Sequence, residues 1–321
     1  MKHLILSLSV AAALAGCAGS GGVSIPNTIG DLPELKSVAA NRITPATGGD
    51  TATSLHTGGG RLRNVHLRYV HPTLRWDMDD DKLIYEAPDG KRYSFTDGFT
   101  DPLVPSVGYR QNPNVPTKHA PQPTDNGGKL IACCEQNSGT TPAAYVNSMR
   151  YGVWFGADGA VDLFAGGISA PVADMQHAAG HTSPTGKATY EVWAFRAKDG
   201  LATSSSWNVR DPNIRSLLTV NFNTGKVGGT IKGNADFGPD IAFGDVNVSG
   251  NTFSGSVTSG GAAGRVDGGF YGKSGWYDPA GSEIGGKITF GGNSSLNSSF
   301  GGSMVGSDKN DLTSTDLNPV P

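Results

Sequence analysis

The stretch LTVNFNTGKVGGTIK, residues 218–232, sets the pattern for the C-terminal half of the chain. Leu218, Val220 and Phe222 alternate with polar residues as far as the turn at 223–225, and apolar or small residues alternate again beyond it. A period of two predicts a strand with one buried face, and a short Asn-Thr-Gly turn predicts that two such strands form a hairpin. We therefore expect this half of the chain to consist of antiparallel strands.

The same alternation recurs at hairpin spacing and predicts about eight strands in all. They are expected at 189–195, 218–222, 227–232, 241–248, 253–258, 265–271, 284–290 and 299–305. Eight antiparallel strands that each carry one apolar face fit a closed barrel filled by side chains. The apolar positions are too small and too sparse for a lipid-facing belt with aromatic girdles. The prediction is an all-β chain that ends in a soluble eight-stranded antiparallel β-barrel over 183–306, followed by a polar tail at 307–321.

Upstream of the barrel, the sequence predicts a β-rich handle domain over 61–182. Strand patterns occur at 129–132, 149–155 and 160–164. Proline and asparagine dominate 100–128, which predicts a long surface loop because such residues are excluded from central strands and helices. Residues 17–60 are rich in Gly, Ser, Thr, Pro and Asn without a sustained period, which predicts a flexible tether.

The first residues are typical of a bacterial lipoprotein. A basic start is followed by the apolar run 4–15, which is too short to span a bilayer and ends in small residues directly before Cys17. This pattern predicts a signal peptide over 1–16, lipidation of the Cys17 thiol and a permanent membrane anchor. Ala18 in place of aspartate favours the outer membrane in the lipoprotein sorting rule. The alternative is an ordinary secretion signal with a chance cysteine.

Composition and motifs exclude several function classes. The net charge of −3 gives no reason to expect nucleic acid as a partner. No nucleophile elbow, phosphate loop or zinc-protease helix is present, so the chain is predicted to be no enzyme and to have no catalytic residues and no metal site. For the adjacent pair Cys133 and Cys134 we expect two buried free thiols, because a disulfide between neighbours is strained; the alternative is that this strained disulfide forms.

Two glycine-rich segments carry a resemblance to a known family. The stretch VDGGFYG at 266–272, followed by GSEIGG at 281–286, resembles the barrel of transferrin-binding protein B-like surface lipoproteins. Residues FAGG at 164–167 and GKATY at 186–190 are similar to the segment that leads into that barrel. Gln176 stands where the family commonly has proline, and 177–185 reads as an insertion. The resemblance covers roughly 164–306.

The resemblance implies a handle and a barrel displayed on the cell surface, often through a Slam-type translocator. The chain has room for only one lobe, which is typical of haemophilins, haemoglobin-capturing lipoproteins and complement factor H binders. The predicted function is therefore binding of a host iron source, preferably haem or haemoglobin, with a TonB-dependent receptor as a further partner. The alternatives are capture of a host complement regulator for immune evasion and a structural lipoprotein that faces the periplasm.

Haem binding needs an imidazole or thioether ligand for iron and apolar cover for the porphyrin. His177 and His181 are the first candidates, His119 is the next, and Met175 could supply a soft second ligand; the alternative is that all are ordinary surface residues. No resident cofactor is certain. For a protein ligand, Trp276 and Tyr277 on the 272–279 loop are candidate interface anchors, unless they fold back on the barrel end.

Overall fold

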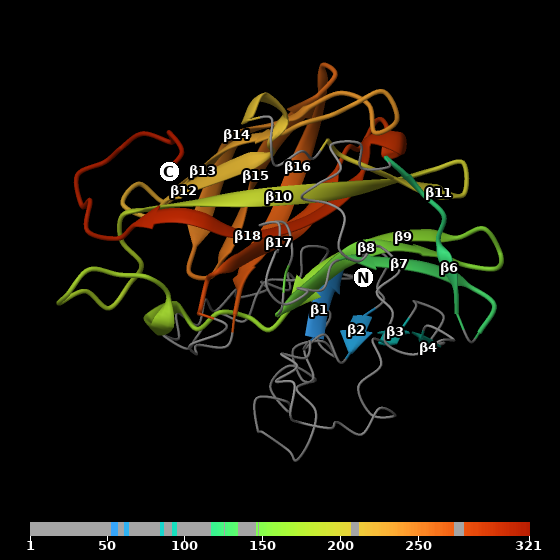
Figure 1. Ribbon diagram of the computed structural model, residues 1–321, viewed down its shortest axis with the longest axis horizontal. Helices are drawn as coiled ribbons and strands as arrows, with labels where there is room; N and C mark the ends of the chain where they lie inside the picture. The colour runs from blue at the N-terminus through green and yellow to red at the C-terminus, as the bar shows by residue number, and fades with distance from the viewer. Residues whose placement is uncertain are drawn as a thin grey trace, which may run out of the picture.

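The computed structural model describes residues 117–124, 126–133, 146, 148–206, 212–272 and 279–321, together with the backbone of four short strands near the N-terminus (Figure 1). These four strands are β1 Thr53–His56, β2 Arg61–Arg63, β3 Ile84–Glu86 and β4 Arg92–Ser94. The elements of the described part are strands apart from three short 3-10 turns, η1 Val172–Asp174, η2 Pro212–Ile214 and η3 Ser294–Leu296. Within this part, no helix is long and apolar enough to cross a membrane. The predicted all-β class is confirmed.

Eight of the strands form a closed antiparallel barrel (Figure 1). They are β10 Lys187–Lys198, β12 Leu217–Asn221, β13 Lys226–Ile231, β14 Ile241–Ser249, β15 Thr252–Ser259, β16 Ala262–Tyr271, β17 Glu283–Thr289 and β18 Ser298–Asp308. From β12 to β18 each strand pairs with the next, and β10 pairs with both β18 and β12. The pairing of β10 with β12 closes the barrel, so the predicted eight-stranded barrel is confirmed.

Side chains fill the barrel and close both of its ends. Every second residue of the strands points inward, and the interior is made of buried aliphatic and aromatic residues, among them Tyr190 and Phe270. At one end Met175, which is 1% exposed, completes this core. At the other end the Arg196 guanidinium lies 4.0 Å from the centre of the Phe237 ring and donates a 2.7 Å hydrogen bond to the Phe237 carbonyl oxygen. Because its interior is packed, the barrel offers ligands its outer surface and its loops.

A five-stranded handle sheet packs on the outside of the barrel. Its order is β1-β9-β8-β7-β6, in which β6 is Gln122–Pro123, β7 is Lys129–Cys133, β8 is Met149–Phe155 and β9 is Val161–Gly167. Strands β2, β3 and β4 form a separate three-stranded sheet. Two further strands, β11 Leu201–Ser204 and β5 Lys118–His119, extend the barrel sheet beyond β10.

Three strands, β1, β5 and β6, correct the sequence-based description. β1 lies inside the predicted tether, yet it pairs with β9 along its whole length. The sequence around β5 and β6 was expected to form one surface loop, yet both strands pair, β5 with β11 and β6 with β7. Both are edge strands, and an edge strand tolerates proline because one side of its backbone needs no partner.

Small residues on the barrel wall let the handle sheet approach closely. Gly285 and Gly301 face β8: a Cβ atom on Gly285 would overlap the Met149 side chain, and one on Gly301 would overlap Tyr151 and Met149. The interface is a second apolar core that joins β7, β8 and β9 to the outer face of β10, β11 and β16. It also contains buried charges, since Lys287 of β17 lies 3.6 Å from the Asp162 carboxylate of β9, with both side chains at most 5% exposed.

Cys133 is disulfide-bonded, so the prediction of a free thiol is wrong for this residue. The sulfur to which it is joined lies outside the described residues. Cys133 is completely buried in the handle–barrel core, with its Sγ 3.2 Å from the Tyr151 hydroxyl. Strain disfavours a bridge between neighbouring cysteines, but disulfides persist in the oxidising environment outside the cytoplasm.

Candidate functional site

Two of the four haem-binding candidates lie on the loop 176–186, at the barrel end that Met175 closes. His181 is exposed and His177 is partly exposed. The His177 Nδ1 atom lies 2.6 Å from the Met175 carbonyl oxygen. A carbonyl oxygen can only accept, so Nδ1 carries the proton, and in the neutral ring Nε2 keeps a free lone pair. This is the arrangement by which proteins usually orient a histidine that binds metal.

The other two candidates are buried. Met175 packs on Gly281 as part of the barrel core and does not present its sulfur to solvent. His119 is 8% exposed, and its Nε2 lies 2.8 Å from the Ser204 Oγ atom. Burial lowers the pKa of His119 from 6.5 to about 4, so the ring is neutral at physiological pH. Its location between β11 and the rings of Trp193 and Phe195 makes it part of the interface between the barrel sheet and the handle.

The candidate interface anchors Trp276 and Tyr277 lie outside the described residues. The described chain stops at Gly272, directly after β16, and resumes at Pro279, after the segment that carries them. Both ends of this segment are fixed, since Gly272 donates to the Ile168 carbonyl and Gly281 donates to the Tyr271 carbonyl. The described residue Gly281, which follows this segment, lies against Met175 at the end of the barrel that Met175 closes.

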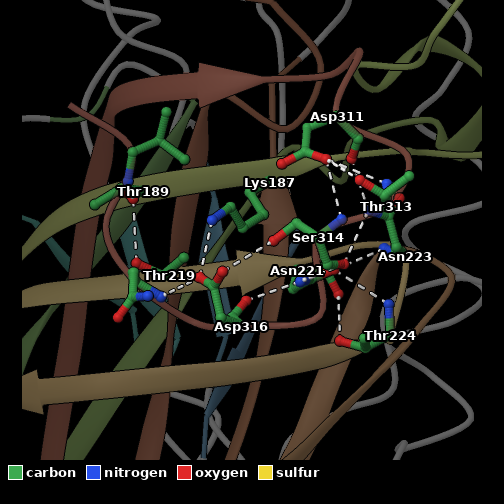
Figure 2. Close-up of polar contacts among 12 residues, drawn as sticks. Lys187, Thr189, Thr219, Asn221, Asn223, Thr224, Asp311, Thr313, Ser314 and Asp316 are labelled. Atoms are coloured by element: carbon green, nitrogen blue, oxygen red, sulfur yellow. Dashed lines mark hydrogen bonds and ion pairs between the residues drawn. The ribbon is translucent and has the colours of Figure 1, made fainter.

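Sequence reasoning missed an ordered C-terminal strap, residues 309–321, which the sequence presented only as a polar tail. Figure 2 shows its contacts with the barrel. The Asn221 amide donates to the Ser314 and Asp316 carbonyl oxygens at 3.1 and 2.8 Å, and the Val320 amide donates to Thr189 Oγ1 at 2.7 Å. These partners lie on β10 and β12, the two strands whose pairing closes the barrel. The only sequence signal was the set of outward polar residues on those strands.

The strap also holds the loop that carries the two histidines. Thr185 Oγ1 donates to the Lys309 carbonyl oxygen at 2.8 Å and accepts a 2.7 Å hydrogen bond from the Ala178 amide. The loop is thus joined to the strap and, through the Gln176 side chain, to the start of β10 at Lys187. Among the residues that the structure describes, no group of three or more His, Cys, Asp or Glu side chains could hold a metal ion. A porphyrin here would depend on the histidines alone.

The opposite end of the molecule has a groove of about 590 Å³ between the handle sheet and β10–β11. It lies between the β8–β9 turn and the β10–β11 turn, both on the right in Figure 1. Its lining is Gly127, Lys129, Phe155, Gly156, Ala157, Gly159, Ala160, Val161, Ala197, Lys198, Asp199 and Gly200. The sequence predicted the β8–β9 hairpin turn, but it did not predict that this turn lies opposite the β10–β11 turn.

Comparison with known protein families shows to which family the chain belongs. The family model described as HpuA, haemoglobin-haptoglobin utilisation, porphyrin transporter, matches residues 81–320. The chain belongs to the HpuA family. The crystal structure of HpuA from Kingella denitrificans in complex with human haemoglobin is 40% identical in sequence, with a TM-score of 0.70, and the match covers 86% of this chain and 94% of that chain. The apo structure of the haemoglobin receptor HpuA from Kingella denitrificans is 39% identical, with the same TM-score, and covers 87% and 96%.

The transferrin-binding protein B-like resemblance stated from the sequence is confirmed as membership of this single-lobe family. Isotype 1 transferrin-binding protein B from serogroup B Neisseria meningitidis also matches, at 23% identity and a TM-score of 0.40, over 66% of this chain and 39% of that chain. No curated protein sequence matches significantly. The HpuA relatives are binding proteins, and one of them is described as a receptor.

Proposed function

We propose that this chain is a surface lipoprotein that captures haemoglobin as an iron source and that it is not an enzyme. The observation that carries this proposal is the match, over 86% of this chain and 94% of the other, to an HpuA solved with human haemoglobin bound. The filled barrel supports it, because side chains occupy the barrel interior and leave its outer surface and loops for a protein ligand. Lipidation at Cys17 and display on the outer membrane are part of the proposal, and so are a Slam-type translocator and a TonB-dependent receptor as partners.

Immobilised chain without its first 20 residues is expected to bind human haemoglobin saturably and to bind neither iron-loaded transferrin nor complement factor H. Surface plasmon resonance with the three proteins in parallel measures this. Binding to factor H alone would instead support immune evasion. Protease accessibility on intact cells addresses the third alternative, because a protein that faces the periplasm would be shielded.

A second candidate function, haem coordination by the 176–186 loop, is favoured by the hydrogen bond between His177 and Met175. That bond keeps Nδ1 protonated and leaves Nε2 to act as a ligand, with the exposed His181 nearby in sequence. The description of the family as a porphyrin transporter supports the same proposal. Haem would then be handled at the barrel end that Met175 closes.

Haemin added to the purified chain is expected to shift the Soret band, and His177→Ala is expected to remove most of the shift. His181→Ala tests the second ligand. Buried His119 supplies the control, because His119→Gln should leave the shift unchanged. An unmodified chain that produces no shift, or a shift that survives the double His177→Ala, His181→Ala replacement, would contradict coordination by this loop.

A further inference from the structure

The groove lies at the edge of the apolar core between the handle sheet and the barrel. Phe155 and Val161 pair directly in the β8–β9 register and lie beside the last turn of β10 and β11. Phe155 is still 8% exposed, whereas Val161 is 50% exposed and has the highest exposure among the large apolar residues of the described chain. Ala197 covers the barrel side of the same core. The groove therefore presents a strip of apolar surface to solvent.

Among the residues that the structure describes, two lysines on the rim of the groove form no ion pair. Lys129 and Lys198 are both exposed, and neither has a carboxylate of the described residues within ion-pair distance, although Lys198 lies near enough to Asp236 for their charges to interact. Elsewhere in the described chain, exposed or partly exposed basic side chains are paired with a carboxylate, as in Lys118–Asp236, Lys187–Asp316, Arg215–Glu191, Lys226–Asp245, Lys232–Asp240 and Arg265–Asp267, with Lys309 as the exception. Two unpaired ammonium groups beside an apolar strip favour a ligand that carries carboxylates.

Three glycines in the turns that line the groove leave room for a polypeptide to bind. Gly127, Gly159 and Gly200 all have positive φ angles, and a Cβ atom built on any of them would meet no atom within 4 Å. A bound segment could therefore approach the backbone of each turn without meeting side chains. Asp199 is the one acidic residue of the lining, at φ +52, and it forms no ion pair with another described residue.

We propose that this groove docks a segment of haemoglobin that presents an apolar side chain flanked by two carboxylates. The apolar side chain covers Val161 and the edge of Phe155, and the carboxylates pair with Lys129 and Lys198. Asp199 repels such a segment and limits its affinity. This inference rests on the proposed function, since it names the surface through which haemoglobin is held.

The test measures haemoglobin affinity by surface plasmon resonance at low and at physiological salt. Val161→Glu and the double variant Lys129→Glu, Lys198→Glu are each expected to weaken binding at least tenfold, and the double variant should also slow association and reduce its salt dependence. Asp199→Asn is expected to strengthen binding about two- to threefold, because asparagine keeps the left-handed backbone and removes the repelling charge. Lys309→Glu is the matched control, since Lys309 is exposed and unpaired but lies beyond β18, at the opposite end of the barrel.

The outcomes separate this inference from the proposed function. Binding by the unmodified chain that is unaffected by the groove variants would overturn the groove and leave haemoglobin capture intact. If Lys309→Glu weakens haemoglobin binding as much as the double variant Lys129→Glu, Lys198→Glu does, the effect is one of net charge. That result would also overturn the groove as the docking site. Failure of the unmodified chain to bind would overturn both. Circular dichroism of each variant shows that the fold persists, which is expected because these side chains are exposed.

Discussion

Replacing Asp162 by asparagine is expected to lower the free energy of unfolding by about 3 to 5 kcal/mol, because it leaves the buried ammonium of Lys287 without its partner. Lys287 is 5% exposed and Asp162 is 3% exposed. Asp162 is the one carboxylate that lies within ion-pair distance of Lys287 among the described residues. Asparagine keeps the shape of the side chain, so the loss reports the missing charge. Urea unfolding at pH 7 measures it.

The pH dependence of the same pair gives a second readout. Burial lowers the pKa of Lys287 from 10.5 to about 8, and the charge of Asp162 partly opposes this shift. Between these values the unfolded chain binds more protons than the folded chain, so the contribution of Lys287 to stability rises with pH. Without the charge of Asp162 the pKa of Lys287 falls further. The rise of stability should then begin below pH 8 in Asp162→Asn, and it should be absent in Lys287→Met.

Two controls make the result specific to a buried pair. The double variant Asp162→Asn, Lys287→Met should recover most of the lost stability, because replacing both charges removes the desolvation penalty together with the attraction. Lys226→Met breaks a pair whose side chains are 43% and 75% exposed and should change stability by less than about 0.5 kcal/mol. Equal losses at the buried and the exposed pair would contradict the argument.

Removing residues 310–321, most of the C-terminal strap, is expected to lower the free energy of unfolding by about 2 to 4 kcal/mol. The strap forms several hydrogen bonds with the barrel, worth about 0.5 to 1.5 kcal/mol each, and covers the β10–β12 pairing that closes it. Asn221 is completely buried beneath it. Hydrogen exchange of β10 and β12 should accelerate more than that of β15 and β16, which lie away from the strap.

Asn221→Ala is the corresponding point variant. Its side chain donates to two strap carbonyls and also accepts from the amides of Asn223 and Thr224, so it joins the strap to the turn after β12. It should cause much of the loss seen on deletion. Thr315→Ala, at an exposed strap residue, should leave stability within about 0.5 kcal/mol. If removal of the strap leaves the free energy of unfolding unchanged, the strap does not stabilise the barrel and the prediction is wrong.

The strands of the barrel could be predicted because their signal is local. Alternation over five to ten residues decides which face of a strand is buried, and the short turn between two alternating runs decides that they pair. The stretch 218–232 became β12 and β13, joined in the expected hairpin. The glycine-rich stretches at 266–272 and 281–286 likewise fall in or beside β16 and β17 and carried the family resemblance that the comparisons confirmed.

Sequence alone predicted the strand content, the closed barrel and the single-lobe family, and it named candidate histidines without showing that one of them is buried. The tertiary structure decided which of these histidines is buried and which are exposed, because burial depends on contacts between residues far apart in the chain. His119 is covered by Ser204, 85 residues later, and Asn221 is covered by Ser314, 93 residues later. The Lys287–Asp162 pair, the groove and the strap arise in the same way. Alternation in a sequence reports which face of a strand is buried, but not which distant segment covers it.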